Sequence, residues 1–265
     1  MGRTLVDPKI AAIIQARVGS TRLPGKVLAE VAGRPMLAHV VERAMDIPHV
    51  TEVILASTTN PADEAIVAWA RQAGIPCVRG SEEDVLDRFR LAARERAVDV
   101  IVRVTSDCPL LDPEVSGLVV REYLERGGTV DYVSNVHPPT YPDGLDTEVF
   151  SRQALEDAWR DARLPSDREH VTTYIWGHPE RFRLAKVIHE KDLSAHRWTV
   201  DTARDLAFVR AVFEATAGGR RPIRLGDVIA LLNRRPEIRE LNAGQQRNEG
   251  LMRSLAADRI ADGGS

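Results

Sequence analysis

Short apolar runs alternate with amphipathic stretches through the first half of this 265-residue chain. The runs have the length and composition of strands buried on both faces of a parallel sheet: residues 10–16, 53–56, 75–78 and 100–104. The stretches between them show helical periodicity and helix-start signals such as Pro35 and Asp112-Pro113: residues 36–45, 61–74, 84–96 and 112–126. This βαβα rhythm predicts an α/β fold, doubly wound around a mostly parallel central sheet.

The rhythm changes in the second half of the chain. Strand-like pieces alternate with helices that start near residues 151 and 168, and two further helices, 202–215 and 225–233, close the fold. The strand-like pieces are residues 131–134, 145–150, 182–189 and 197–200. We expect a single domain over residues 1–243 that ends in a C-terminal elaboration, followed by a loose polar tail over residues 244–265.

Composition narrows the class of protein. The 36 Lys and Arg against 39 Asp and Glu give a formal net charge of −3, which does not favour a nucleic-acid partner. No apolar run approaches the ~20 residues that span a bilayer, and the polar N-terminus does not resemble a signal peptide. Cys77 and Cys108 lack metal-ligand or redox spacing. We therefore expect a cytoplasmic enzyme or binding protein with neither a nucleic-acid nor a membrane partner.

The loop after the first predicted strand is rich in cations and glycines. Residues 15–26 contain Arg17, Arg22 and Lys26 together with two hydroxyl side chains and two glycines. Ligands of open α/β sheets bind beyond the carboxyl ends of strands, so this loop is predicted to hold a polyphosphate. The loop is not a P-loop, because five residues separate Gly19 from Gly25 and Val27 stands where that motif has Ser or Thr. Lys26 has a flexible stem and follows Pro24-Gly25 in this loop, so we expect that it can be replaced at little structural cost.

Residues 13–28, IIQARVGSTRLPGKVL, resemble the signature loop of the cytidylyltransferase family, which includes the CMP-Kdo and CMP-sialic acid synthetases. The branch most similar is the spore-coat polysaccharide F type. The resemblance continues through five further blocks: residues 80–89, 103–110, 143–148, 167–172 and 197–201. It implies a glycosyltransferase-A-like nucleotidyltransferase fold, use of Mg²⁺ and a homodimer.

The resemblance also implies roles for particular residues. It points to Arg17, Lys26 and Asp107 as catalytic, and to Asp107 and Asp201 as metal ligands after strands 100–104 and 197–200. The nucleotide-binding set is Gln15, Ala16, Arg17, Gly19, Ser20, Arg22, Lys26, Asp84, Arg88 and Ser106. The acceptor-binding set is Asp143, Asp146, Glu148, Arg168 and His170.

Structural roles remain open for several of these residues. Asp201 precedes a predicted helix and could be its N-cap, and Asp84 could equally cap the next helix with Arg88 as its i+4 partner. Asp107 could form a turn before Pro109, and a histidine at a helix start, such as His170, is more often structural than ligand-binding. Asp112 is predicted to be a helix cap alone.

The expected reaction is transfer of CMP from CTP to a sugar acid or a related small acidic or phosphorylated acceptor, with release of pyrophosphate. Such a step would serve glycan or surface polysaccharide precursor synthesis. The alternatives are a nucleotidyltransferase for another nucleoside triphosphate, a glycosyltransferase on the same fold, and a catalytically idle nucleotide-binding protein. Asp107-Cys108-Pro109 lacks the second acidic residue of a glycosyltransferase metal motif. An idle binder would not need both Asp107 and Asp201.

Overall fold

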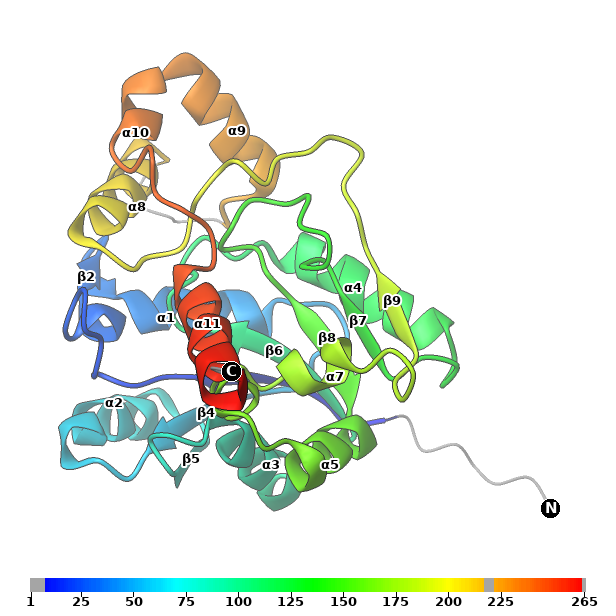
Figure 1. Ribbon diagram of the computed structural model, residues 1–265. Helices are drawn as coiled ribbons and strands as arrows, with labels where there is room; N and C mark the ends of the chain where they lie inside the picture. Colours follow the sequence, from blue (N-terminus) through cyan, green and yellow to red (C-terminus); the bar gives the residue numbers. More distant parts are fainter. Residues whose placement is uncertain (1–7, 217–221, 264–265) are drawn as a thin grey trace.

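A seven-stranded sheet forms the centre of the protein in the computed structural model, which describes residues 8–216 and 222–263 (Figure 1). The strand order is β5-β4-β1-β6-β8-β7-β9, and β8 runs antiparallel to its neighbours β6 and β7 whereas the other pairings are parallel. The strands are β1 (Ile10–Gln15), β4 (Glu52–Thr58), β5 (Cys77–Gly80), β6 (Val100–Thr105), β7 (Tyr132–Ser134), β8 (Glu148–Ser151) and β9 (Leu184–Lys186). A short hairpin of β2 (Glu30–Val31) and β3 (Arg34–Pro35) stands apart from this sheet.

The two faces of the sheet bury alternate side chains of each strand. In β1, Ile10, Ala12 and Ile14 pack on one face, and Ala11 and Ile13 pack on the other. Three helices cover the first face: α1 (Met36–Met45), α2 (Glu64–Ala73) and α4 (Pro113–Glu125). Three others cover the second face: α3 (Val85–Glu95), α5 (Arg152–Asp161) and α7 (Thr173–Gly177). Burial on both faces explains why the central strands read as continuous apolar runs.

A third apolar cluster forms beside the sheet. Helices α8 (Ala203–Ala215), α9 (Leu225–Arg234) and α10 (Pro236–Glu240) pack there around the fully buried Trp198 and Phe213. Two short 3₁₀ turns, η1 (Lys26–Leu28) and η2 (Pro61–Asp63), and helix α6 (Pro165–His170) complete the body. This cluster is the C-terminal elaboration predicted from the sequence.

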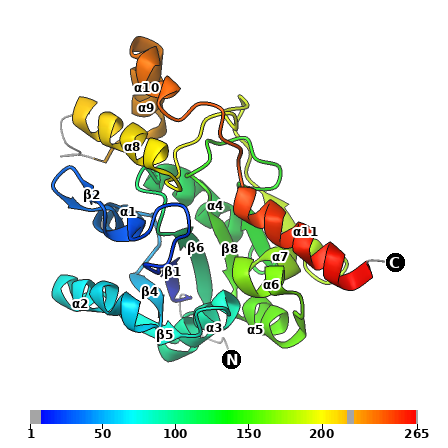
Figure 2. The ribbon, with the colours of Figure 1, turned by 60° about the vertical axis from the view of Figure 1, so that its left-hand side comes forward.

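Two stretches differ from the sequence-based expectation. Residues 197–200 do not form a strand, because only one bridge, Asp143↔Arg197, joins them to another segment. The segment expected to be a loose tail contains helix α11 (Glu249–Gly263), which lies against α6 (Figures 1 and 2). None of the helices within residues 8–216 and 222–263 combines the length and apolarity needed to cross a lipid bilayer.

Candidate active site

A cavity of about 400 Å³ opens where the carboxyl ends of β1 and β6 lie side by side. In the sheet, β4 lies on one side of β1 and β6 lies on the other. The order in which the chain adds strands therefore reverses at β1, which makes this edge the topological switch point of the sheet. The sequence-predicted residues that line the cavity are Gln15, Ala16, Arg17, Gly19, Ser20, Arg22, Lys26, Arg88, Ser106, Asp107, Asp143, Asp146, Glu148, His170 and Asp201. The fold therefore gathers residues from six distant parts of the sequence.

The loop between β1 and η1 is closed by its own backbone. The amide of Gly25 donates to the carbonyl of Val18 at 3.0 Å, and Gly25 has φ 73°, a left-handed conformation that glycine adopts without strain. The buried carboxylate of Asp63 accepts from the amide of Val18 at 2.6 Å and ties the loop to the body. These contacts hold Lys26, at the start of η1, in the cavity.

Lys26 is buried at the centre of the cavity, among three oxygens. Its Nζ donates to Asp107 Oδ2 at 2.9 Å, to Asp201 Oδ1 at 2.8 Å and to the carbonyl of Val200 at 2.7 Å. Burial lowers the pKa of Lys26, but the two carboxylates outweigh that effect and raise its pKa above the ordinary value. Burial likewise opposes ionisation of Asp107, yet Lys26 brings the pKa of Asp107 down to about 2. Lys26 and Asp107 are therefore both charged at neutral pH.

Asp201 is held by cations and does not cap a helix. Arg197 Nη2 lies 2.7 Å from Asp201 Oδ2, and Arg22 Nη2 lies 3.0 Å from the same oxygen. The N-cap of α8 is Thr202, whose hydroxyl accepts from the amide of Asp205 in a capping box. The capping role left open for Asp201 therefore belongs to Thr202.

At the other end of the cavity, Glu148 is satisfied by three donors. Arg103 Nη1 forms a short ion pair with Oε2, and the hydroxyls of Tyr132 and Thr172 each donate to Oε1 at 2.6 Å. Burial opposes the ionised form, but Arg103 and the two hydroxyls lower the pKa of Glu148 below its usual value. Arg103 also donates to Gln15 Oε1 at 3.2 Å, so it connects the predicted acceptor residues to the end of β1.

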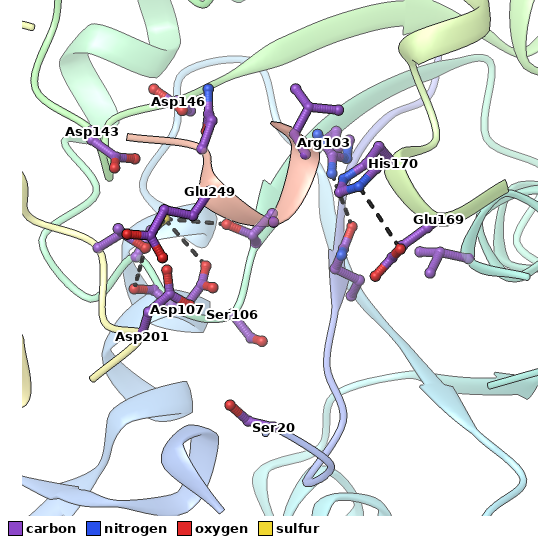
Figure 3. Close-up of a pocket in the computed structure, with 18 of the residues that line it drawn as sticks. Ser20, Arg103, Ser106, Asp107, Asp143, Asp146, Glu169, His170, Asp201 and Glu249 are labelled. Atoms are coloured by element: carbon purple, nitrogen blue, oxygen red, sulfur yellow. Dashed lines mark hydrogen bonds and ion pairs between the residues drawn. The ribbon is translucent and has the colours of Figure 1, made fainter. Parts of the chain in front are cut away.

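Asp143 and Asp146 also line the cavity, on the side where Figure 3 draws Glu249 and Asp201. Burial, together with the neighbouring charge of Asp146, raises the pKa of Asp143 to about 7, although Arg197 Nη1 donates to its Oδ2 at 3.0 Å. Burial also raises the pKa of Asp146, and Arg247 opposes this through an ion pair. A carboxyl group that titrates near neutral pH can exchange a proton with a bound hydroxyl.

Asp84 and Arg168 lie outside this cavity, in a neighbouring depression. Asp84 caps α3 by accepting from the amide of Asp87 at 2.8 Å, and its other oxygen lies 3.6 Å from Arg168 Nη1. The structure therefore supports the capping alternative for Asp84 and gives Arg168 a partner other than an acceptor. Asp112 is the N-cap of α4, as predicted.

Several lining residues were not assigned a role from the sequence. The sequence could have indicated a role for Arg103, because it is a charged residue inside an otherwise apolar strand. Arg197, next to Trp198, has no comparable pattern around it. Glu249 and Arg253 lie in a polar segment that carries no pattern.

The donors around Lys26 suit a hard cation. Mg²⁺ prefers oxygen ligands and is commonly bound by one or two carboxylates together with substrate phosphates. The two carboxylates Asp107 and Asp201 both lie within 3 Å of one cationic atom, Lys26 Nζ. Within the described residues, no group of three or more His, Cys, Asp or Glu side chains is arranged to hold a metal ion. The pair therefore fits a metal that a bound phosphate helps to coordinate.

A glycine-containing cationic loop at the switch point of a mostly parallel sheet, faced by two carboxylates, is typical of nucleotide-binding α/β proteins. The chain belongs to the cytidylyltransferase family, because the model of that family matches residues 11–214. It is thus a CTP-dependent nucleotidyltransferase.

Relatives cover nearly the whole chain. An uncharacterized protein of Methanocaldococcus jannaschii is 37% identical over 89% of this chain and 95% of its own length. The spore coat polysaccharide biosynthesis protein SpsF of Bacillus subtilis is 33% identical over 86% of this chain and 95% of its own. A cytidylyltransferase structure from Leptospira borgpetersenii superposes with a TM-score of 0.84 at 30% identity, covering 90% of this chain and 100% of that one. These similarities extend the family assignment beyond the matched region.

Proposed function

We propose that the protein transfers CMP from CTP to a sugar acid or a related small acidic or phosphorylated acceptor and releases pyrophosphate. The observation that carries this proposal is that Lys26, at the end of the cationic loop, lies between Asp107 and Asp201 in the cavity. Relatives named 3-deoxy-manno-octulosonate cytidylyltransferase, such as that of Geobacter metallireducens at 33% identity over 58% of this chain, support a sugar-acid acceptor. The name of the Bacillus subtilis relative supports a role in surface polysaccharide precursor synthesis.

In this proposal two sets of cavity residues bind the two substrates. Arg17, Arg22 and Lys26 would bind the triphosphate and neutralise the charge that develops on the departing pyrophosphate. The acceptor oxygen would attack the α-phosphorus in line from the side of Asp143, Asp146 and Glu148. Asp143, whose pKa burial and Asp146 raise to about 7, would take up the acceptor's proton.

Asp107 and Asp201 would hold Mg²⁺, which supplies Lewis-acid stabilisation of the phosphate oxygens when bound. The protein's own contribution at this position is to orient both carboxylates. Arg197 fixes Asp201, and Lys26 fixes Asp107. The family resemblance further supports a cytoplasmic location and a homodimer. Light scattering of the purified protein would test the homodimer.

The experiment compares nucleotides by their effect on thermal unfolding. With Mg²⁺ present, CTP should raise Tm more than ATP, GTP or UTP, because a ligand that binds only the native state stabilises it by about 2.7 kcal/mol at 100 times its Kd. Pyrophosphate release should then appear with one member of a panel of sugar acids and phosphorylated acceptors, and chelation of Mg²⁺ should abolish it. Equal shifts for all four nucleotides would contradict the CTP assignment.

A further inference from the structure

Arg22, a cation of the loop proposed to bind phosphate, is already engaged by two carboxylates. Its Nη1 donates to Glu249 Oε2 at 2.8 Å, and its Nη2 lies 3.0 Å from Asp201 Oδ2. Glu249 is the first residue of α11, and it lies in the cavity on the side of Asp107 and Asp201 (Figure 3). The last segment of the chain thus places a negative charge beside the first loop.

The segment that precedes Glu249 is fixed to the site. Asn242 donates to the carbonyl of Arg197 at 2.9 Å, and the carbonyl of Gln246 accepts from Arg197 Nη1 at 2.9 Å. Arg247 donates to the carbonyl of Tyr141 at 2.9 Å and forms an ion pair with Asp146. Glu249 therefore reaches Arg22 from an anchored backbone, not from a free end.

The segment that follows Glu249 is fixed as well. Ser254 Oγ lies 3.0 Å from His170 Nε2 and donates to Glu169 Oε2 at 3.1 Å, which joins α11 to the end of α6. Arg253 Nη2 donates to Glu249 Oε2 at 3.1 Å, one turn further along α11. The carboxylate of Glu249 is thus positioned from both sides.

We infer that Glu249 is a further residue of the nucleotide site, one that occupies Arg22 until a triphosphate displaces it. The inference rests on the proposed function. A triphosphate bound at the loop would use the N–H donors of Arg22. The carboxylate of Glu249 already accepts from Arg22 at 2.8 Å, so it competes with the triphosphate for these donors. Nucleotide affinity is therefore reduced by the free energy needed to break the Arg22–Glu249 contact. Since both side chains are about 30% exposed, that contribution is modest.

The test is the affinity for CTP, measured by calorimetry with Mg²⁺ present. Glu249→Gln keeps the shape of the side chain and removes its charge, so we expect CTP to bind about fivefold more tightly. Glu237→Gln is the matched control. Glu237 is likewise a glutamate that pairs with arginine, here Arg235, but it is exposed and lies in α10 outside the cavity. CTP affinity should be unchanged in this control.

A double-mutant cycle separates the contact from general repulsion. Arg22→Gln should weaken CTP binding, and Glu249→Gln added to it should have no further effect, because the partner for which Glu249 competes is gone. The inference is overturned if Glu249→Gln fails to tighten binding in the wild-type background, or if it tightens binding equally without Arg22. Wild-type protein that binds no CTP would instead refute the proposed function.

Discussion

Lys26 shows how a charged side chain is fixed by the charges that fold around it. Its partners Asp107 and Asp201 are 81 and 175 residues away in sequence, so no local pattern could reveal that Lys26 is buried. Residue types and their position after a strand predicted a cationic loop and two carboxylates. The sequence could not show that these groups neutralise one another, because that depends on the packing of the second half of the molecule.

The ion pairs of Lys26 argue against the expectation that it can be replaced at little structural cost. Lys26→Met keeps the apolar stem but leaves Asp107 and Asp201 facing each other with one cation fewer. We expect a loss of ~2 kcal/mol in the free energy of unfolding, below the range for fully buried pairs because both carboxylates are 20–25% exposed.

Turnover of Lys26→Met should also fall by ~10²-fold or more, since the charge that stabilises the leaving group is removed. Urea unfolding at pH 7 and pyrophosphate release measure the two effects. Lys191→Met, at an exposed position, is the control and should leave both unchanged. Wild-type stability in Lys26→Met would contradict the buried-pair description.

At the scale of elements, the strands and helices around the sheet were predictable from periodicity, because each buries a continuous apolar face. Residues 197–200 were wrongly predicted to form a strand. Their apolar side chains are buried, as in a strand, but their backbone pairs with no strand. Helix α11 gave no signal, since it buries no apolar stripe and is held by polar contacts to α6. A helix that is held by polar contacts does not need apolar residues at helical spacing, so its sequence shows no such periodicity.

Gly144 lies in the loop of residues 143–147, directly against the backbone of the segment before Asp201. It has φ 106°, and a Cβ there would lie 2.7 Å from the carbonyl carbon of Trp198 and 2.8 Å from the amide nitrogen of Thr199. Because both atoms belong to backbone, Gly144→Ala should cost more than ~3 kcal/mol of unfolding free energy.

A matched control for this prediction is Gly127→Ala. Gly127 also has a positive φ, 54°, but no atom lies within 4 Å of the added Cβ, so ~1 kcal/mol is expected. Denaturant unfolding of both variants makes the comparison. Similar losses at the two positions would show that the backbone contact at Gly144 contributes nothing.

At the scale of the whole molecule, Arg197 joins parts that are otherwise separate. Its guanidinium contacts Asp143 in the loop before β8, Asp201 in the cavity, Asp205 in α8 and the carbonyl of Gln246 ahead of α11. A planar fork with five donors can serve these directions at once, whereas an ammonium group cannot.

Arg197→Lys should therefore destabilise the protein by about 3 kcal/mol, because Asp205, which has no exposed surface, would lose a charged partner. Arg204→Lys, on the exposed side of α8, is the control and should change the unfolding free energy by less than ~0.5 kcal/mol. Urea unfolding at neutral pH compares them. Equal effects of the two substitutions would rule out a special role for the guanidinium of Arg197.

The wide spacing of Lys26 and its partners has a consequence for how the protein is made. A growing chain emerges from the ribosome N-terminus first, so the loop that contains Lys26 is exposed long before Asp201 and Glu249 have been translated. Until then the ammonium group lacks the second of its two carboxylate partners and is better solvated by water than buried. We therefore expect the loop to stay open during synthesis, and the candidate active site to be among the last parts of the protein to form.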